Sequence, residues 1–325
     1  MKAILYIHID AVKYNGTNTN GFVKNLKKFV RDLQEIDCWD AANNKIVVSE
    51  DIWIASVCNG MTFPNFINKY LERDEVNFMY QILANTSNKT NITYRELQEN
   101  SIYKSDEKEC ISLIVLNELK NESDEISSEE NQVPQNPYMT FDNYQIVYGR
   151  DSWFCLRRQI LANHPGDANS FMQDCRKYFP DLTFSKDCEN RLETKYLVGI
   201  PRKIVYYLSC INDCFSNFRK NHANPNSINL LLADFSGIYG MDEAASMQRT
   251  PEKKEQYSFE FYKYKSRTTK KVCCDPHFKI RHYDENCLSA IKEDGEKCYG
   301  RIYFNLGDTD IHPTNILIGS IGPHV

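Results

Sequence analysis

Runs of apolar residues with strand and helix periods alternate along the first two thirds of the chain. The segment at residues 2–14 begins with a period-2 pattern, in which Leu5, Ile7 and Ile9 share one face. Apolar residues then recur at spacings of three and four over residues 22–36, which is typical of an amphipathic helix. We predict a half-exposed edge strand at the start of the chain, followed by a helix that packs in a core.

The same periodicities predict a series of shorter elements further along the chain. Asp167 is placed to be the N-cap of one predicted helix, and Pro201 to be the first residue of another. The segment at residues 153–161 fits either a helix or a strand. We predict strands at residues 45–48, 53–57, 144–148 and 182–184, and helices at residues 63–70, 76–83, 167–179 and 201–218.

The last fifty residues hold three strand-like runs, which together predict one antiparallel sheet. In the last run, apolar residues favour a strand inside the sheet, and Gly319 and Gly322 favour a bulge or a close approach of another backbone. We therefore predict that the C-terminus is ordered and that deletion of residues 321–325 abolishes function. The three runs lie at residues 276–282, 300–304 and 315–325.

The fold class that follows is α+β, with an α-rich N-terminal and middle region and a C-terminal antiparallel sheet. Residues 121–131 contain five acids and no base, a composition typical of an exposed linker or loop. We divide the chain into an N-terminal α/β unit at residues 1–120, an acidic linker or loop at residues 121–137, an α-rich middle region at residues 138–250 and a C-terminal sheet domain at residues 251–325.

Charge is distributed unevenly in this chain of 325 residues and net charge −5. Residues 261–283 contain seven Lys or Arg and a single acid, so any contact with nucleic acid must come from this local patch. Tyr262 and Tyr264 alternate with lysine and arginine residues, which favours stacking of nucleobases on the tyrosines beside phosphate contacts. The alternative is a basic strand face that is merely solvated. The residues that we predict to bind nucleic acid are Lys263, Lys265, Arg267, Lys270, Lys271, His277 and Tyr303.

The C-terminal runs carry a further pattern. Phe278-Lys279-Ile280-Arg281, followed by Gly300-Arg301-Ile302-Tyr303-Phe304 and a β-branched run, resembles the core sheet of RelE/HigB-type toxin ribonucleases. The resemblance implies a RelE-like sheet that cleaves RNA without a metal ion. It also implies that basic residues on the strands bind phosphate and stabilise the transition state. The implied catalytic residues are Lys279, Arg281, Arg301 and His324.

Cysteines are numerous, at twelve, but scattered, and no Cys-x-x-Cys pair occurs. We predict reduced thiols, no metal site and a cytoplasmic location. No phosphate loop, dinucleotide fingerprint or apolar run of membrane-spanning length is present, so we predict neither a cofactor nor a membrane contact. The set nearest to a zinc site is Cys273, Cys274, His277, His282, Cys287 and Cys298.

Two hypotheses on function follow. The first is a bacterial toxin or anti-phage defence effector that cleaves RNA, rather than DNA, through the C-terminal sheet, because the chain as a whole also resembles uncharacterised bacterial proteins of defence or mobile loci. The second is a non-catalytic subunit that binds nucleic acid or a partner protein, such as an antitoxin or the ATPase of a defence complex. A metal-dependent nuclease that uses Asp10, or acids elsewhere in the chain, is a further alternative.

Overall fold

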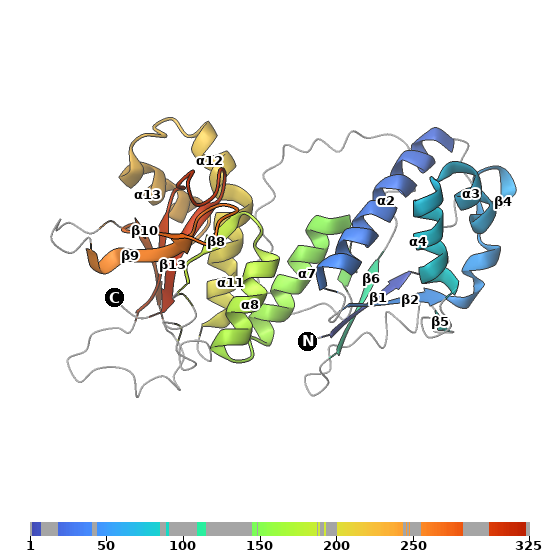
Figure 1. Cartoon of the computed structure of the whole chain (residues 1–325), viewed down its shortest axis with the longest axis horizontal. Helices are drawn as coiled ribbons and strands as arrows, with labels where there is room; N and C mark the ends of the chain where they lie inside the picture. Colours follow the sequence, from blue (N-terminus) through green and yellow to red (C-terminus); the bar gives the residue numbers. More distant parts are fainter. Residues whose placement is uncertain are drawn as a thin grey trace. The chain divides into compact units, whose positions relative to one another are not determined.

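The structure is a computed structural model in which the chain divides into two compact units (Figure 1). Met1–Glu130 and Thr140–Arg157 form the first unit, and Asn131–Met139 and Arg158–Val325 form the second. Within the described residues, no helix combines the length and the apolar character that crossing a membrane requires. The described residues are 2–7, 19–40, 44–84, 89–90, 109–114, 145–147, 149–186, 188, 192, 200–242, 245, 247, 255–281 and 299–322.

The first unit contains a five-stranded parallel sheet with the order β5-β2-β1-β6-β7. The prediction of an edge strand at the start of the chain is wrong, because β1 pairs with β2 on one side and with β6 on the other. Its last residue, Ile7, is buried, as is usual in a parallel sheet covered on its faces. The strands are β1 (Lys2–Ile7), β2 (Asn44–Ser49), β5 (Lys89–Thr90), β6 (Glu109–Ile114) and β7 (Gln145–Val147).

The predicted core helix of this unit is confirmed as α2 (Thr19–Asp40), which packs against β2 and α4. Every apolar position of the predicted stripe is buried, because spacings of three and four place these side chains on one face. The segment predicted as a strand at residues 53–57 is instead a 3-10 turn followed by a two-residue strand. The remaining elements are η1 (Glu50–Ile54), β3 (Ser56–Val57), η2 (Cys58–Gly60), β4 (Met61–Thr62), α3 (Phe63–Tyr70) and α4 (Arg73–Ala84).

The boundary between the units falls within α7 (Gly149–Asn163), and the other helices of the middle region belong to the second unit. Asp167 is the predicted N-cap, since its side chain accepts a hydrogen bond from the Ser170 amide at 2.8 Å. The helix predicted to start at Pro201 continues to residue 221 through a π-helical turn. These elements are α8 (Ala168–Tyr178), α11 (Pro201–Cys210), η4 (Ile211–Phe215), α12 (Ser216–Asn221) and α13 (Ile228–Ile238).

The three predicted C-terminal strands form an antiparallel sheet that a fourth strand makes mixed. The order is β11-β12-β13-β8, and β8 pairs with β13 in parallel, which corrects the purely antiparallel prediction. The last strand therefore lies inside the sheet, as predicted. The coarse α+β class is confirmed. The strands are β8 (Leu182–Phe184), β11 (His277–Arg281), β12 (Tyr299–Asn305) and β13 (Ile316–Gly322).

Helices cover one face of this mixed sheet. Phe278 of β11 stacks on Phe304 of β12, with ring centroids 4.9 Å apart. Tyr207 of α11 and Phe235 of α13 contact Phe278 at 6.0 and 6.2 Å, and Phe215 of η4 contacts Phe304 at 6.3 Å. These aromatic contacts fix β11 and β12 against the helices, as edge-on and stacked ring pairs do in protein cores.

A hairpin of β9 (Ser258–Tyr262) and β10 (Thr269–Cys273) packs on the opposite face, where β9 lies against β13 (Figure 1). The two layers approach closely at Gly319, because a side-chain carbon there would clash with the ring of Phe259. Gly319 is also the extra residue of a β-bulge, which confirms the predicted bulge. The core beneath the hairpin consists of Tyr257, Phe259, Phe261, Val272, Cys274, Tyr303, Ile311 and Leu317.

Candidate nucleic-acid interface

The β9–β10 hairpin exposes aromatic side chains at the end where its strands turn. Along β9, Phe259 and Phe261 point into the core and are buried. Tyr262 and Tyr264 are 55% and 46% exposed and belong to the few large apolar side chains that the described surface presents. Period-2 alternation explains why Tyr262 points outward, and the turn that follows exposes Tyr264.

Four cations lie on the same hairpin as these rings and are here called the hairpin cations: Lys263, Lys265, Arg267 and Lys271. All four side chains are exposed. None of them forms an ion pair with another described residue. They were all predicted from the sequence as residues that bind nucleic acid, and the structure brings them together on one hairpin.

Lys270 differs from its neighbours because it faces the other way. It lies opposite Phe261 in the β9–β10 register, on the packed side of the hairpin. Its ammonium donates to Asp308 at 2.7 Å and to Asp310 at 2.9 Å, in the loop between β12 and β13. These two hydrogen bonds raise the pKa of Lys270. Its role in the structure is to tie the hairpin to this loop, and its contact with nucleic acid stays a prediction.

The same loop holds the turn of the hairpin in a second way. The amide of Tyr264 donates to the carbonyl oxygen of Asp310 at 2.9 Å. The ring of His312 meets the ring of Tyr264 edge to face, with centroids 5.1 Å apart. The Nδ1 atom of His312 accepts a hydrogen bond from the Asn315 amide at 3.2 Å, which orients the imidazole. Tyr264 is therefore exposed but anchored.

One carboxylate, Glu260, lies on the exposed side of the hairpin, and it is paired. It accepts hydrogen bonds from Thr269 at 2.6 Å and from Lys186 at 2.9 Å. The Thr269 bond first, and then the Lys186 bond, lower the pKa of Glu260. The Lys186 ammonium also lies 5.4 Å from the ring centroid of Tyr262, within cation–π range.

The strands beneath the hairpin bring together two of the four implied catalytic residues. Lys279 of β11 lies directly opposite Arg301 of β12, and both side chains are half-buried. Arg301 donates from Nη1 to the hydroxyl oxygen of Tyr303 at 3.2 Å. The Arg281 side chain and His324 lie outside what the structure describes, so their predicted roles stay predictions.

His277 and Tyr303 lie opposite each other on the same strands, and both are buried. Their rings are 5.0 Å apart, and Tyr303 stacks on Tyr257 at 5.3 Å. Burial lowers the pKa of His277 to about 4, and nearby Arg301 and Lys279 act in the same direction. His277 is therefore uncharged at pH 7. Both residues serve as packing here, and their contact with nucleic acid stays a prediction.

Ser320 is a polar group near this site that the sequence pattern did not single out. It lies opposite Tyr303 on β13 and is 1% exposed. Among the described residues, its hydroxyl and the Nε atom of Arg301 are buried atoms without a hydrogen-bond partner. A serine inside an apolar run does not indicate a functional site in the sequence, because only the register of the strands places it on the same face as Arg301.

The structure describes only part of the cysteine and histidine set that lies nearest to a zinc site. Cys273 and Cys274 lie at the end of β10 and just after it, and His282, Cys287 and Cys298 lie outside the described residues. Within the described residues, no group of three or more His, Cys, Asp or Glu side chains is arranged to hold a metal ion.

Comparison of the chain with protein families, curated proteins and solved structures finds no match.

Proposed function

We propose that the second unit binds nucleic acid through the β9–β10 hairpin. The observation that carries the proposal is the presence of four exposed hairpin cations, without ion-pair partners in the described part of the chain, on the same hairpin as two exposed tyrosines. Each phosphate that such a cation neutralises releases a counterion, which makes the contact favourable at low salt. Aromatic rings between the cations add a surface on which bases stack.

The three carboxylates near the hairpin pair with lysines other than the hairpin cations, which separates this surface from an ordinary solvated strand face. Glu260 is bonded to Lys186, and Asp308 and Asp310 share Lys270. Six cations therefore face three carboxylates, so that the local charge is positive in a protein of net charge −5. An anion that approaches the hairpin therefore meets an excess of positive charge.

A variant in which the four hairpin cations are replaced by glutamine tests the proposal. Four lost phosphate contacts lower the affinity for a labelled 12-nucleotide RNA by about 100-fold or more at 0.1 M salt. The measurement is equilibrium fluorescence anisotropy with the full chain. Because all four side chains are exposed, the variant keeps its fold, which circular dichroism verifies.

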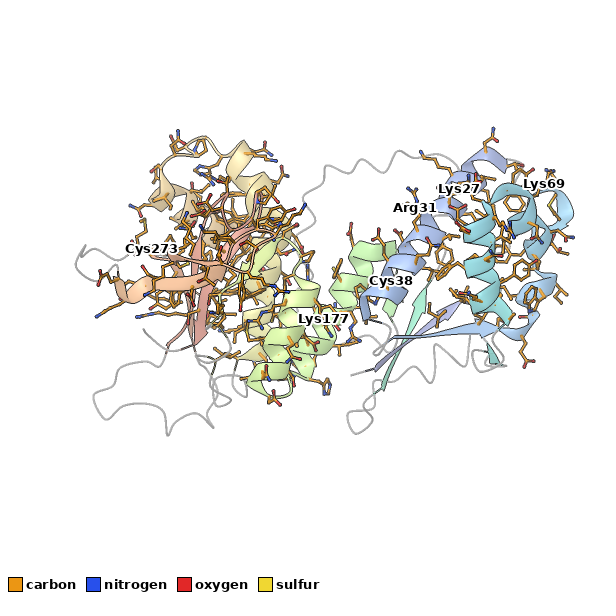
Figure 2. All side chains as sticks on the ribbon, in the orientation of Figure 1. Lys27, Arg31, Cys38, Lys69, Lys177 and Cys273 are labelled. Carbon is orange, nitrogen blue, oxygen red and sulfur yellow. The ribbon has the colours of Figure 1, made fainter. Side chains whose placement is uncertain are left out.

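The matched control removes the same charges elsewhere. Lys24, Arg31, Lys69 and Lys177 are also three lysines and one arginine, all exposed and outside the hairpin; the last three are labelled in Figure 2. Their replacement by glutamine leaves the affinity within about threefold of the wild type, since all four hairpin cations are kept. Equal losses in both variants would contradict the proposal, as would a wild-type protein that binds no RNA.

RNA cleavage at the strands beneath the hairpin is a second candidate function. It is favoured by one specific observation, the cross-strand pair of Lys279 and Arg301 with the Tyr303 hydroxyl beside it. In a RelE-like sheet, these cations stabilise the charge that develops on the phosphorane. His277 supplies no proton for the leaving oxygen, because it is buried and uncharged at pH 7.

The cleavage candidate predicts turnover without metal ions. The full chain, with a chelator present, cuts a labelled RNA but not the matched DNA, because the attacking group is the 2′-hydroxyl. Replacing Arg301 by Gln lowers the rate about 100-fold, as removal of one stabilising donor does elsewhere. Binding measured on the same samples separates loss of affinity from loss of chemistry. Intact RNA after incubation with wild-type protein that binds it rejects cleavage and leaves the binding proposal in place.

A further inference from the structure

We infer that the hairpin takes single-stranded nucleic acid, with unpaired bases stacked on Tyr262 and Tyr264. This inference rests on the proposed function and names the substrate class of the same site. The proposed function needs only cations and phosphates, and both are present in a duplex as well as in a single strand. The two tyrosines are the feature that distinguishes the two ligands.

The two tyrosine rings remain exposed to solvent. Tyr262 and Tyr264 are about half exposed, although burying an aromatic ring is strongly favourable. Their neighbours Phe259 and Phe261 are buried in the same hairpin, so the fold can bury rings here and leaves these two outside. A ring that stays exposed among cations offers its face to another flat group.

Each of the two tyrosine rings has a lysine ammonium group beside it. The Lys265 ammonium lies over the ring of Tyr264, 5.1 Å from its centroid, and the Lys186 ammonium lies over the ring of Tyr262 at 5.4 Å. A base is therefore expected to stack on the opposite face of each ring. A nucleic-acid strand whose bases stack on the tyrosine rings brings its phosphates close to the same ammonium groups. Stacking and phosphate contact therefore occur together at each tyrosine, as in proteins that bind single strands without reading their sequence.

Tyr264 and the turn of the hairpin are held in place by the loop between β12 and β13. The Tyr264 amide is bonded to Asp310, its ring contacts His312, and Lys270 ties the hairpin to the same loop through Asp308. Little conformational entropy is then lost when a base stacks, because the ring is held before the ligand arrives. The loop between β12 and β13 thus acts as the support of the binding surface.

A duplex does not use these features. Its bases are stacked on one another, and only their edges are accessible in the grooves. A two-stranded ribbon can enter the major groove, but it reads base edges with polar side chains, and tyrosine ring faces gain nothing there. We therefore expect the tyrosines to contribute to the affinity for a single strand and not to the affinity for a duplex.

The test compares ligands of one sequence at one salt concentration. The full chain is titrated into a labelled 12-nucleotide single strand, its blunt duplex, and a 12-unit abasic strand that keeps the phosphates. Wild-type protein binds the single strand about tenfold or more tightly than either of the other two. Replacing Tyr262 or Tyr264 by Ala lowers the single-strand affinity about tenfold each and changes the duplex affinity by less than about twofold.

Phenylalanine at the same two positions is the matched control. It keeps the ring and loses only the hydroxyl, so the affinity for the single strand stays within about threefold of the wild type. Equal binding of all three ligands, or alanine variants that bind as the wild type does, overturns the stacking inference. If the glutamine variant of the hairpin cations still loses binding in that case, the proposed function stands. Wild-type protein that binds none of the ligands overturns both.

Discussion

Replacing Gly319 by Ala destabilises the second unit by about 2 to 3 kcal/mol and lowers its unfolding temperature by about 5 to 10 °C. The added carbon would lie 2.3 Å from one ring atom of Phe259 and 2.8 Å from the sulfur of Cys274. Neither neighbour can yield easily, because both side chains are buried beneath the hairpin. The sheet and the hairpin must therefore separate at this point. Thermal and urea unfolding followed by circular dichroism measure the effect.

Gly237 provides the matched control for this change. It lies in α13, and a side-chain carbon there would meet nothing within 4 Å. Alanine at this position stabilises the protein by about 0.5 kcal/mol, since glycine is the less favourable residue in a helix. Equal stability of the Gly319→Ala variant and the wild type would show that the hairpin does not pack on β13 as described.

The second large effect concerns Arg158, which is 5% exposed within the helical layer. Its Nη1 atom lies 2.6 Å from Asp213, which the π-helical turn η4 carries, and its Nε atom donates to the Tyr178 carbonyl oxygen at 2.8 Å. Replacing Asp213 by Ala removes the carboxylate and leaves the guanidinium charge buried. We expect a loss of about 2 to 3 kcal/mol in urea unfolding, below the value for a fully buried pair because Asp213 is partly exposed.

The surface pair on α8 is the control for the buried one. Lys177, which is labelled in Figure 2, lies 3.6 Å from Asp174, and both side chains are partly exposed. Replacing Lys177 by Met changes stability by less than about 0.5 kcal/mol, because water screens such a pair. In the buried pair, the double variant Arg158→Met with Asp213→Ala is more stable than the sum of its single changes predicts. Strict additivity would contradict a direct interaction between the two charges.

The sequence patterns that predicted the fold best were those in which many side chains share one face. The stripe from Phe22 to Ile36 predicted α2, and Asp167 and Pro201 marked helix starts that the structure confirms. Local signals such as caps and amphipathic stripes are sufficient for helices. They need no information about which segments meet in space.

Strand pairing was less predictable because it depends on distant segments. β1 was predicted at an edge and lies between β2 and β6, the latter being a six-residue strand that the patterns did not predict. β8 has only three residues, and so short a run does not indicate whether its partner runs parallel. The direction of a pair depends on where the chain re-enters the sheet, which periodicity does not specify.

The residues of the candidate site show the same difference between local signals and strand pairing. Composition alone predicted the hairpin cations, because a basic run beside a turn is exposed in almost any hairpin. Composition also predicted Lys270, whose register with Phe261 turns it toward Asp308 and Asp310. Tyr303, a further predicted residue, is buried in the four-stranded sheet. Ser320 was missed, since its position beside Arg301 depends on the pairing of β12 with β13. Charge was readable from the sequence, but the face on which each charge lies was not.

The dependence of binding on salt tests the central claim most directly. For a single strand, the logarithm of the association constant falls with the logarithm of the salt concentration by about 0.7 for each phosphate contact, so four hairpin cations give a slope near −2.8. Anisotropy titrations of a 12-nucleotide strand from 50 to 300 mM salt measure this slope. We expect about −2.8 or steeper for the wild type and a slope shallower by about 2.8 for the glutamine variant of the hairpin cations. Equal slopes for the two proteins would contradict binding through the β9–β10 hairpin.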